Sequence, residues 1–307
     1  MLSKTNGILF EHPPRSVTAP KRLSVFTRSD QPPLMRLTER DKRILEAIHA
    51  YDGILADYQI QRLFFTGRTQ MQTRTRLLYQ HGYLARPDRR HRALLPSMVY
   101  WLGERGAAYV AGLDGQSIQE FTYRREPRWQ QVEHDLAVND VRIALTQACV
   151  RHPHLLLEEW LPQSEFWAHP DRVEYTDLTG KRLARRVRPD GYCVILSGDR
   201  RFRLLWEIDR STEDNPRFVR EKVLPGIAYI RNPAYVARFG HPSGLWLIVT
   251  TSERRLRNMK RQTEQAAGDN AHLFYFTTIE QIAADTVLSA PIWRRGGGEA
   301  PTTLLAV

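Results

Sequence analysis

The most constraining feature of the sequence is a series of short helical patterns between Leu37 and about residue 115, each ended by a turn. The first begins at Thr38, which with Asp41 forms the pattern in which a threonine side chain accepts a hydrogen bond from a free helix amide. Apolar residues then recur at helical spacing until Asp52–Gly53 ends the helix. A second short helix follows, and Gly67 separates it from a third. The pattern predicts a small helical unit.

The third helix is predicted from about Arg68 to His81, and Gly82 supplies its C-terminal stop. Two strands, Tyr83–Arg86 and Met98–Leu102, then flank the basic segment 87–92, and a fourth helix closes the unit. Three helices followed by a two-stranded ribbon is the order of a winged helix-turn-helix. In that fold the third helix enters the major groove and the ribbon tip contacts the DNA backbone or the minor groove. The segment therefore predicts a unit that binds double-stranded DNA.

The side chains expected to contact DNA lie on the polar face of the third helix and at the ribbon tip. Those of the helix are types that hydrogen-bond base edges or phosphates. The ribbon tip is dense in positive charge and has Asp88 as its one carboxylate. A winged helix that serves only protein contacts is the alternative interpretation. The predicted DNA-binding residues are Arg68, Gln70, Gln72, Thr73, Arg76, Arg89, Arg90 and Arg92.

The net charge agrees with a polyanionic partner. The chain has 45 lysines and arginines against 34 aspartates and glutamates, a formal charge of +11, which favours nucleic acid first and an anionic membrane second. No apolar run of roughly 18 residues and no basic anchor helix occurs, so we expect no membrane partner. Met1–Phe10 lacks the features of a signal peptide, and we expect a cytoplasmic protein. Cys149 and Cys193 are too far apart in sequence to suggest a zinc site and are predicted core residues.

The composition changes along the chain predict four segments. Residues 1–36 contain five prolines and several basic residues, and they are predicted to form a flexible basic arm. The winged helix occupies residues 37–115. A second domain is predicted over residues 128–288, and residues 289–307, with three consecutive glycines, are predicted to be a flexible tail.

The second domain alternates helices and strands in an order that predicts a mixed sheet with helices on both faces. The fold class is therefore α/β, or α+β for the whole chain. The predicted helices are 128–152, 217–232 and 253–267, with a short one at 279–284. The predicted strands are 155–160, 187–196, 202–209, 245–251 and 272–276.

Two acidic positions in this domain resemble the PD-(D/E)xK nuclease superfamily: Pro189–Asp190 in one strand and Glu207–Ile208–Asp209 at the end of the next. The resemblance implies a restriction-endonuclease-like fold in which Asp190 and Glu207 hold Mg²⁺. The intervening hairpin can bring the two carboxylates together. Phosphodiester cleavage needs a hard cation with oxygen ligands, to polarise the phosphate and to help generate hydroxide. The predicted cofactor is therefore Mg²⁺, with Asp190 and Glu207 as its ligands.

The sequence departs from that superfamily at one position. The superfamily usually has a lysine two residues after the glutamate, where this chain has Asp209. Lys222 on the following helix is predicted to reach back in its place, and Arg210 is a further basic candidate. From the first helix of the domain, Glu133 is the first choice for an additional acidic residue and Asp140 the second. The predicted catalytic residues are Asp190, Glu207, Asp209, Lys222 and Glu133.

Two questions about this site stay open on the sequence. Asp190 also fits a turn beside proline and glycine, and Glu207 and Asp209 also fit carboxylates that pair with arginines to anchor a strand end. A basic stretch borders the acidic residues and either holds the DNA backbone near the metal or is a solvated hairpin. It comprises Lys181, Arg182, Arg185, Arg186, Arg188, Arg200, Arg201 and Arg203.

The wider chain, from about residue 37 to 280, resembles the replication-relaxation family. The resemblance rests on the 37–113 unit and on four motifs, which are His134–Arg142, Arg188–Gly191, Glu207–Thr212 and Val249–Ser252. It implies a role in plasmid replication or in the relaxation of mobile-element DNA. The expected partners are double-stranded DNA, a second copy of the chain, and replication or mobile-element proteins. The alternative is a non-enzymatic DNA-binding regulator or replication accessory factor, with the nuclease-like domain as a degenerate scaffold for dimerisation or partner binding.

Overall fold

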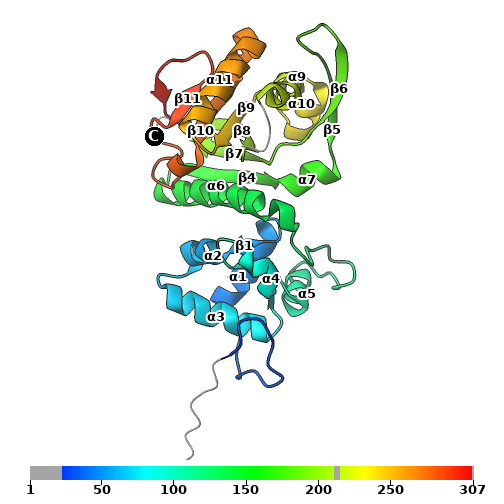
Figure 1. Cartoon of the computed structure of the whole chain (residues 1–307), viewed down its shortest axis with the longest axis vertical. Coiled ribbons are helices and arrows are strands. Elements are labelled where there is room, and N and C mark those ends of the chain that lie inside the picture. Colours follow the sequence, from blue (N-terminus) through cyan, green and yellow to red (C-terminus); the bar gives the residue numbers. More distant parts are fainter. Residues whose placement is uncertain (1–22, 211–214, 306–307) are drawn as a thin grey trace, which may run out of the picture.

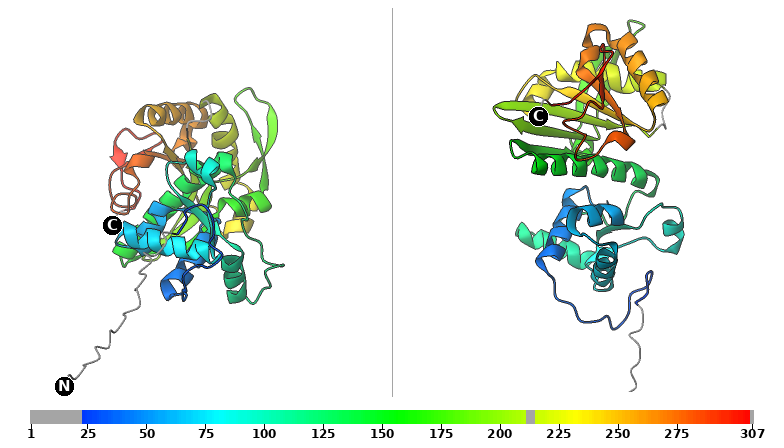
Figure 2. Two further views of the ribbon diagram at one scale, coloured as in Figure 1. Left: turned by 60° about the horizontal axis from the view of Figure 1, so that its bottom comes forward. Right: turned by 90° about the vertical axis from the view of Figure 1, so that its left-hand side faces the viewer.

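The computed structural model describes residues 23–210 and 215–305, and it has two parts joined by one long helix. Helical elements of the N-terminal part lie on one side of α6 (Val132–Arg151), and a large sheet lies on the other side (Figures 1 and 2). The boundaries predicted for the domains remain predictions.

The N-terminal part contains the predicted helices and one short helix that the sequence reasoning missed. Thr38 and Asp41 form the predicted cap, in which the Asp41 amide donates to Thr38 Oγ1 and the Thr38 amide donates to Asp41 Oδ2 at 2.7 Å. The helices are α1 (Glu39–Ala50), α2 (Asp57–Phe64), α3 (Arg68–Gln80), α4 (Arg89–Ala93) and α5 (Glu104–Leu113).

Three short antiparallel strands, in the order β1-β3-β2, complete this part. The strands are β1 (Leu55–Ala56), β2 (Leu84–Ala85) and β3 (Val99–Leu102). The two predicted strands do pair, with Leu84 opposite Leu102. The segment between them is not an open tip, however. Asp88 caps it, accepting a 2.7 Å hydrogen bond from the His91 amide, and residues 89–93 form α4.

The predicted flexible arm is wrong for its described part, residues 23–36. The Ser29 amide donates to Gln80 Oε1 at 2.7 Å, and Gln80 Nε2 donates to the Ser24 carbonyl at 2.9 Å. Arg28 Nε donates to the Tyr79 carbonyl at 3.0 Å. These bonds fasten the segment to the C-terminal end of α3, so it is part of the folded unit. The rest of the predicted arm, residues 1–22, lies outside the described residues.

The second part is built on a seven-stranded mixed sheet in the order β12-β11-β10-β9-β8-β7-β4. The β8–β9 and β9–β10 pairs are parallel and the others are antiparallel. A separate hairpin, β5–β6, stands beside this sheet (Figure 1). The strands are β4 (Leu155–Pro162), β5 (Asp171–Thr176), β6 (Arg182–Val187), β7 (Gly191–Ser197), β8 (Arg200–Ile208), β9 (Leu245–Thr250), β10 (Phe274–Thr278), β11 (Trp293–Arg295) and β12 (Pro301–Thr302).

Helices cover both faces of the sheet, as the α/β pattern predicts. They are α6, α7 (Gln163–Ala168), α8 (Asn215–Phe218), a π-helical turn (Val219–Val223), α9 (Leu224–Ile230), α10 (Pro233–Phe239) and α11 (Glu253–Ala267). Alternate strand residues enter different cores. Tyr192 and Leu205 pack in the core that includes α9 to α11, whereas Cys193 and Leu204 pack against residues of α6. Both cysteines are buried, as predicted.

Two element predictions in this part need correction. The predicted helix 217–232 is interrupted by the π-helical turn Val219–Val223. Pro225, which lacks an amide donor, is the second residue of α9, which follows that turn. Val187 ends β6 and does not begin β7, so Arg188–Asp190 forms the connection between those strands.

The predicted flexible tail is also wrong for residues 291–305. The indole of Trp293 is fully buried and donates to the Val287 carbonyl at 2.8 Å. Leu304 and Leu305 join the same core, and the chain adds β11 and β12 to the sheet edge. Three large apolar side chains therefore fix a segment whose glycines and arginines suggested disorder.

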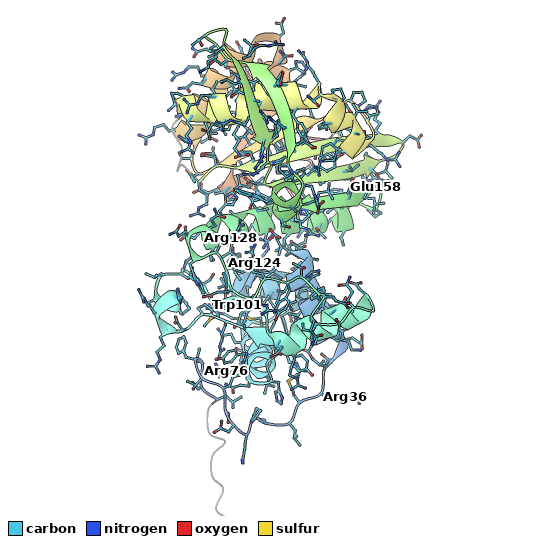
Figure 3. All side chains as sticks on the ribbon, turned by 90° about the vertical axis from the view of Figure 1, so that its right-hand side faces the viewer. Arg36, Arg76, Trp101, Arg124, Arg128 and Glu158 are labelled. Carbon is cyan, nitrogen blue, oxygen red and sulfur yellow. The ribbon has the colours of Figure 1, made fainter. Side chains whose placement is uncertain are left out.

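Helix α6 connects the two parts because it is buried on two sides. Val141, Ala144 and Ala148 belong to the sheet core, whereas Leu136 and Ile143 pack with N-terminal residues. The hydrogen bonds at this junction are made by side chains that are also buried, Asn139, Gln59 and Asp135. Asn139 Nδ2 donates to the Ile54 carbonyl at 2.8 Å, and Gln59 Nε2 donates to the Leu136 carbonyl at 2.8 Å. Asp135 accepts from Arg124 and Arg128 at 2.6 and 3.0 Å. Both arginines lie at the junction of the two parts (Figure 3). Within the described ranges, no helix is both long and apolar enough to cross a membrane.

Candidate functional site

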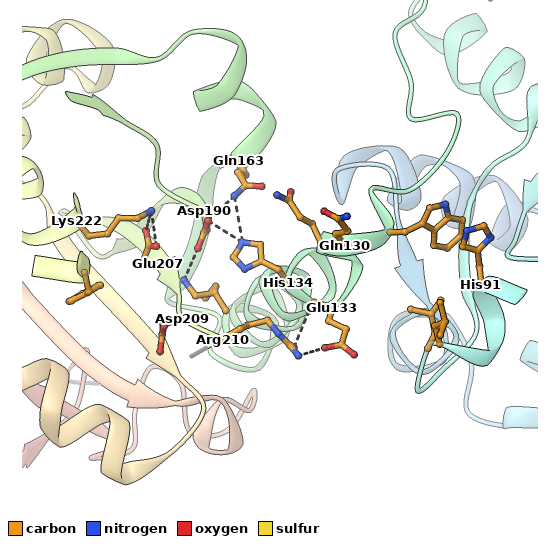
Figure 4. A pocket seen from close by; sticks show the side chains of 16 residues that line it. His91, Gln130, Glu133, His134, Gln163, Asp190, Glu207, Asp209, Arg210 and Lys222 are labelled. Atoms are coloured by element: carbon orange, nitrogen blue, oxygen red, sulfur yellow. Dashed lines mark hydrogen bonds and ion pairs between the residues drawn. The ribbon is translucent and has the colours of Figure 1, made fainter. Parts of the chain in front are cut away.

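The β7–β8 hairpin brings Asp190 and Glu207 together at the end of the sheet near α6 (Figure 4). Gly191 is paired with Trp206, so the residues next to them along the chain are neighbours across the hairpin. The Asp190 amide donates to the Trp206 carbonyl at 2.8 Å, and Asp190 Oδ2 accepts from the Ile208 amide at 2.7 Å. Asp190 is 3% exposed and Glu207 is 8% exposed. The two predicted metal ligands therefore form a buried carboxylate pair.

Lys222 reaches this pair from the π-helical turn. Its Nζ lies 2.7 Å from Glu207 Oε1 and 2.8 Å from Oε2. The structure thus places an ammonium group beside the glutamate, although the chain has no lysine at residue 209. Lys222 lies in the π-helical turn and not in a strand. Its position beside Glu207 could therefore not be predicted from the spacing of residues along a strand.

Two residues of the network were missed by the sequence reasoning. His134 Nε2 lies 3.1 Å from Asp190 Oδ1, and Gln163 Nε2 donates to the same oxygen at 2.7 Å. His134 projects from α6 and Gln163 is the first residue of α7. His134 lies next to Glu133 and begins one of the motifs of the family resemblance, but neither signal assigned it a role in the site. No sequence signal pointed to Gln163. Both oxygens of the Asp190 carboxylate thus have protein partners, which fixes the orientation of the carboxylate.

Burial and charge perturb the pKa values of this network in different directions. Burial, with a smaller contribution from Asp190, raises the pKa of Glu207 to about 8, although Lys222 opposes the shift. Burial also tends to raise the pKa of Asp190, but the His134 cation and Lys222 outweigh it and hold that pKa below its ordinary value. The Asp190 charge raises the pKa of His134 to about 9. At neutral pH the structure therefore favours an aspartate–histidine ion pair beside a glutamate that readily binds a proton.

The other predicted acids have different partners. Asp209 accepts from Arg255 Nε and Nη2 at 2.8 and 2.9 Å and from Thr250 Oγ1 at 2.6 Å, so it is directed to β9 and α11. Glu133 pairs with Arg210 at the edge of the site. Both residues line the same cavity as the Asp190–Glu207 pair, but their carboxylates are directed to these arginines.

Asp140, the second choice on α6, is turned toward the N-terminal part. It accepts from Tyr58 Oη at 2.8 Å and from Gln59 Nε2 at 3.0 Å. It therefore contributes to the junction between the two parts.

A cavity of about 490 Å³ opens beside the acidic pair and is lined by both parts of the chain. Asp190, Glu207 and Lys222 lie on one wall, and His91 lies on the opposite wall (Figure 4). Leu94 and Leu95 also line the cavity. The His91 ring stacks on Trp129, with centroids 4.0 Å apart and planes at 12°. The site thus faces α4 and the segment that follows it.

The predicted DNA-binding residues divide between α3 and α4. Arg68, Gln70, Gln72 and Thr73 are exposed on α3, and Arg76 is half-buried. On α4, Arg89 and Arg90 are exposed. Arg92 is half-buried, and its Nη1 donates to the Leu95 carbonyl at 2.6 Å. The guanidinium of Arg89 lies 5.5 Å from the centroid of the Phe26 ring.

The donor set of the acidic pair suits a hard cation. Magnesium is held in proteins through one or two carboxylates together with waters and substrate phosphates. Asp190 and Glu207 supply two such carboxylates. In the part of the chain that the structure describes, no group of three or more His, Cys, Asp and Glu side chains is placed to hold a metal. Two carboxylates are fewer protein ligands than a closed zinc site needs, and they could hold a hard cation only with water and phosphate as its other ligands.

The fold and this site define an α/β protein with a helical N-terminal unit and a buried carboxylate pair at the junction of its two parts. Residues 45–224 match a family model described as replication-relaxation. Because the match covers more than half of the chain, the chain belongs to the replication-relaxation family. This membership confirms the resemblance seen in the sequence and supports a role in the replication or relaxation of mobile elements. No curated protein matches the chain.

Proposed function

We propose that this member of the replication-relaxation family binds double-stranded DNA and cuts a phosphodiester bond with Mg²⁺ at the Asp190–Glu207 pair. The observation that carries the proposal is the convergence of Asp190, Glu207 and Lys222 from three separate segments in one cavity. Structural ion pairs also bury charges, but a carboxylate pair with a lysine in a cleft is the arrangement that metal-assisted phosphodiester cleavage requires.

Each side chain has a specific task in this proposal. Asp190 and Glu207 hold Mg²⁺, which when bound polarises the phosphate and lowers the pKa of a water molecule. Gln163 and His134 bond to Asp190 Oδ1 and keep that carboxylate in one orientation. Lys222 places a positive charge where negative charge develops on the phosphate, as preorganised donors do in other enzymes.

The N-terminal part supplies DNA binding in this proposal, as a winged helix-turn-helix. The exposed polar face of α3 would lie in the major groove, and α4 would contact the backbone where a wing does in related folds. Support comes from the strand pair β2–β3, which follows α3 directly, and from the exposed arginines of α4. Because His91 also lines the cavity, DNA held on α4 would lie next to the acidic pair.

A second candidate function is a DNA-binding accessory factor with a silent site. The observation that favours it is that both carboxylates already accept hydrogen bonds or form ion pairs within the chain. Asp190 accepts from His134, Gln163 and the Ile208 amide, and both oxygens of Glu207 contact Lys222. A metal ion would have to compete with these donors.

Incubation with supercoiled plasmid in Mg²⁺ or Mn²⁺ separates the two functions. The test variant is Asp190→Asn with Glu207→Gln. The matched control is Glu158→Gln with Asp199→Asn, which removes two exposed carboxylates outside the site, one in the middle of β4 and one at the β7–β8 turn. Nicking or linearisation by the native chain and the control, but not by the test variant, supports the nuclease. Equal plasmid binding without cleavage by all three proteins, over a range of target sequences, supports the accessory factor.

A further inference from the structure

A second cavity lies on the other side of the acidic pair. It has a volume of about 230 Å³ and shares Gln163, Asp190 and Lys222 with the larger cavity. Its other walls come from α7 and β6, which lie next to each other in Figure 1, and from the β6–β7 connection. The wall that carries Asp190 and Lys222 therefore separates two chambers. We call the smaller one the arginine chamber, after Arg185, Arg186 and Arg188, which line it.

The arginine chamber has an excess of positive charge. Its cations are the three arginines and Lys222, and its carboxylates are Asp190 and Glu221. Glu221 is already paired with Arg185 at 3.1 Å and with Arg217 at 3.2 Å. Asp190 is paired with His134. Among the described residues, Arg186 and Arg188 take part in no ion pair, so their charges are available to an anion.

Arg188 is held in place without a polar partner. Its guanidinium lies 4.0 Å from the centroid of the Trp167 ring, and its Nε is buried with no hydrogen-bond acceptor among the described residues. Stacking on an aromatic face orients a guanidinium and leaves the N–H groups at its edge, in the guanidinium plane, able to donate to a ligand. A buried donor without an acceptor costs free energy until a ligand supplies one. The geometry is that of a preorganised anion site.

The chemistry of the chamber selects a phosphate group. Guanidinium groups bind phosphate through paired hydrogen bonds. The small volume suits one phosphate with part of its sugar and excludes a duplex. Trp167 is 48% exposed and offers an apolar surface beside the arginines, on which a sugar or base can pack.

We propose that the arginine chamber is a phosphate-binding subsite, in which Arg186 and Arg188 hold the phosphate next to the scissile one on the same DNA strand. The inference rests on the proposed nuclease function and specifies how its substrate strand is placed. A strand that extends from the large cavity into the arginine chamber must pass Asp190 and Lys222, which line both cavities. Binding of the neighbouring phosphate would thus position the bond to be cut.

The rest of the predicted basic stretch has no part in this subsite. Lys181 and Arg182 lie at the far end of the β5–β6 hairpin, and Arg200 and Arg201 lie at the β7–β8 turn, where Arg201 pairs with Glu158 at 2.9 Å. None of these four residues lines the chamber, and neither does Arg203, the last residue of the stretch. Arg182 therefore provides a control on the same strand as Arg186.

The test measures binding of a fluorescent single-stranded oligonucleotide by anisotropy, in EDTA so that no metal-dependent cleavage occurs. The variants are Arg186→Gln with Arg188→Gln, the control Arg182→Gln, and Trp167→Ala. We expect the double variant to bind about tenfold more weakly than the native chain, because it cannot form the charge-assisted hydrogen bonds. Its salt slope should fall by about 0.7 for each phosphate that it no longer neutralises. Arg182→Gln should stay within about twofold of the native chain, as expected for a solvated surface charge. If the double variant does not fold, the same binding measurement is made on Arg186→Gln alone, because this residue is exposed.

A second readout distinguishes a strand phosphate from a free anion. Inorganic phosphate and a nucleoside monophosphate are added as competitors, with chloride at matched ionic strength as the reference. If the chamber binds a phosphate that is part of a strand, Trp167→Ala should weaken the binding of the oligonucleotide and of the monophosphate. It should leave the binding of inorganic phosphate unchanged. Equal losses for the double variant and Arg182→Gln would overturn the subsite. Because binding is measured without metal, failure of plasmid cleavage would leave this result unaffected.

Discussion

Lys222 Nζ lies 2.7 Å from Glu207 Oε1, although the two residues are 15 positions apart and come from different elements. The lysine therefore places a positive charge beside the glutamate, although residue 209, two positions after the glutamate, is not a lysine. Asp209, which stands there in the sequence, turns instead to Arg255. The fold thus pairs Glu207 with a lysine that is distant from it in the sequence.

Lys222→Met tests whether that ammonium group acts on the substrate. We expect plasmid cleavage to fall by a factor on the order of 100 or more, as for the loss of one preorganised charge donor. At a pH high enough to ionise Glu207 in the variant as well, Mg²⁺ binding measured by calorimetry should tighten, because a competing cation has left Glu207. The control is Lys260→Met, which removes a lysine paired with Glu264 on α11. Unchanged cleavage and unchanged Mg²⁺ affinity would show that Lys222 only neutralises a buried carboxylate.

Mg²⁺ binding should depend on pH through Glu207. Burial raises the pKa of this carboxyl to about 8, so below that pH the metal must displace a proton. The apparent Mg²⁺ affinity is expected to fall about tenfold for each pH unit below 8 and to level off above it. Calorimetry in two buffers of different ionisation enthalpy counts the released proton. Glu207→Gln should remove both the binding and the proton release, and pH-independent binding by the native chain would contradict the assignment.

Arg89→Gln with Arg90→Gln tests the DNA contact of α4. Both side chains are exposed, so their replacement should leave the fold intact. Duplex affinity should fall, and the slope of log affinity against log salt should decrease by about 0.9 for each phosphate that the variant no longer neutralises. Arg92 is left in place because it bonds to the Leu95 carbonyl. Arg200→Gln with Arg201→Gln, at the β7–β8 turn, is the control for the same loss of charge, and an equal effect there would remove α4 from the interface.

Gln72→Ala tests the base-reading role of α3. This side chain is exposed on the polar face of the helix, and its amide group makes no hydrogen bond to another described residue. Loss of a base contact should reduce the discrimination between DNA sequences by about 1–3 kcal/mol, measured by selection from a random pool. If the affinity falls equally for every sequence, Gln72 contacts only the backbone.

The stability of the N-terminal part should depend on the buried pair of Asp41 and Arg74. Burial tends to raise the pKa of Asp41, but hydrogen bonds from Arg74 and Thr38 outweigh it and hold the pKa below its ordinary value. The stabilisation is therefore complete above the ordinary aspartate pKa of about 3.9, and it is lost as the pH falls through the lower value of the folded state. Asp41→Asn should lower the free energy of unfolding by about 2–3 kcal/mol, less than for a fully buried pair because Arg74 is 23% exposed. Glu39→Gln, which breaks the exposed pair with Lys42, should change it by less than about 0.5 kcal/mol in urea titrations.

Local sequence signals predicted most of the secondary structure. The helix cap at Thr38, the third helix from Arg68 and the helix at Glu253–Ala267 all depend on contacts within a few residues, and the structure has them nearly where expected. The prediction that a hairpin joins Asp190 to Glu207 also needed only the spacing of two adjacent strands. The prediction of a flexible tail was wrong, because Trp293 packs in a core that is formed by elements distant in sequence.

The sequence by itself determined the family, the main helices and strands of both parts, and the two carboxylates of the candidate site, but not α4, the β5–β6 hairpin or the strands β11 and β12. Those features rest on periodicity and on neighbours along the chain. Only the tertiary structure decided that His134, Gln163 and Lys222 meet those carboxylates and that Asp209 does not. Side chains from α6, α7 and the π-helical turn converge because those elements pack on one end of the sheet. A polar contact between residues far apart in sequence leaves no periodic pattern, so its partners become known only when the chain is folded.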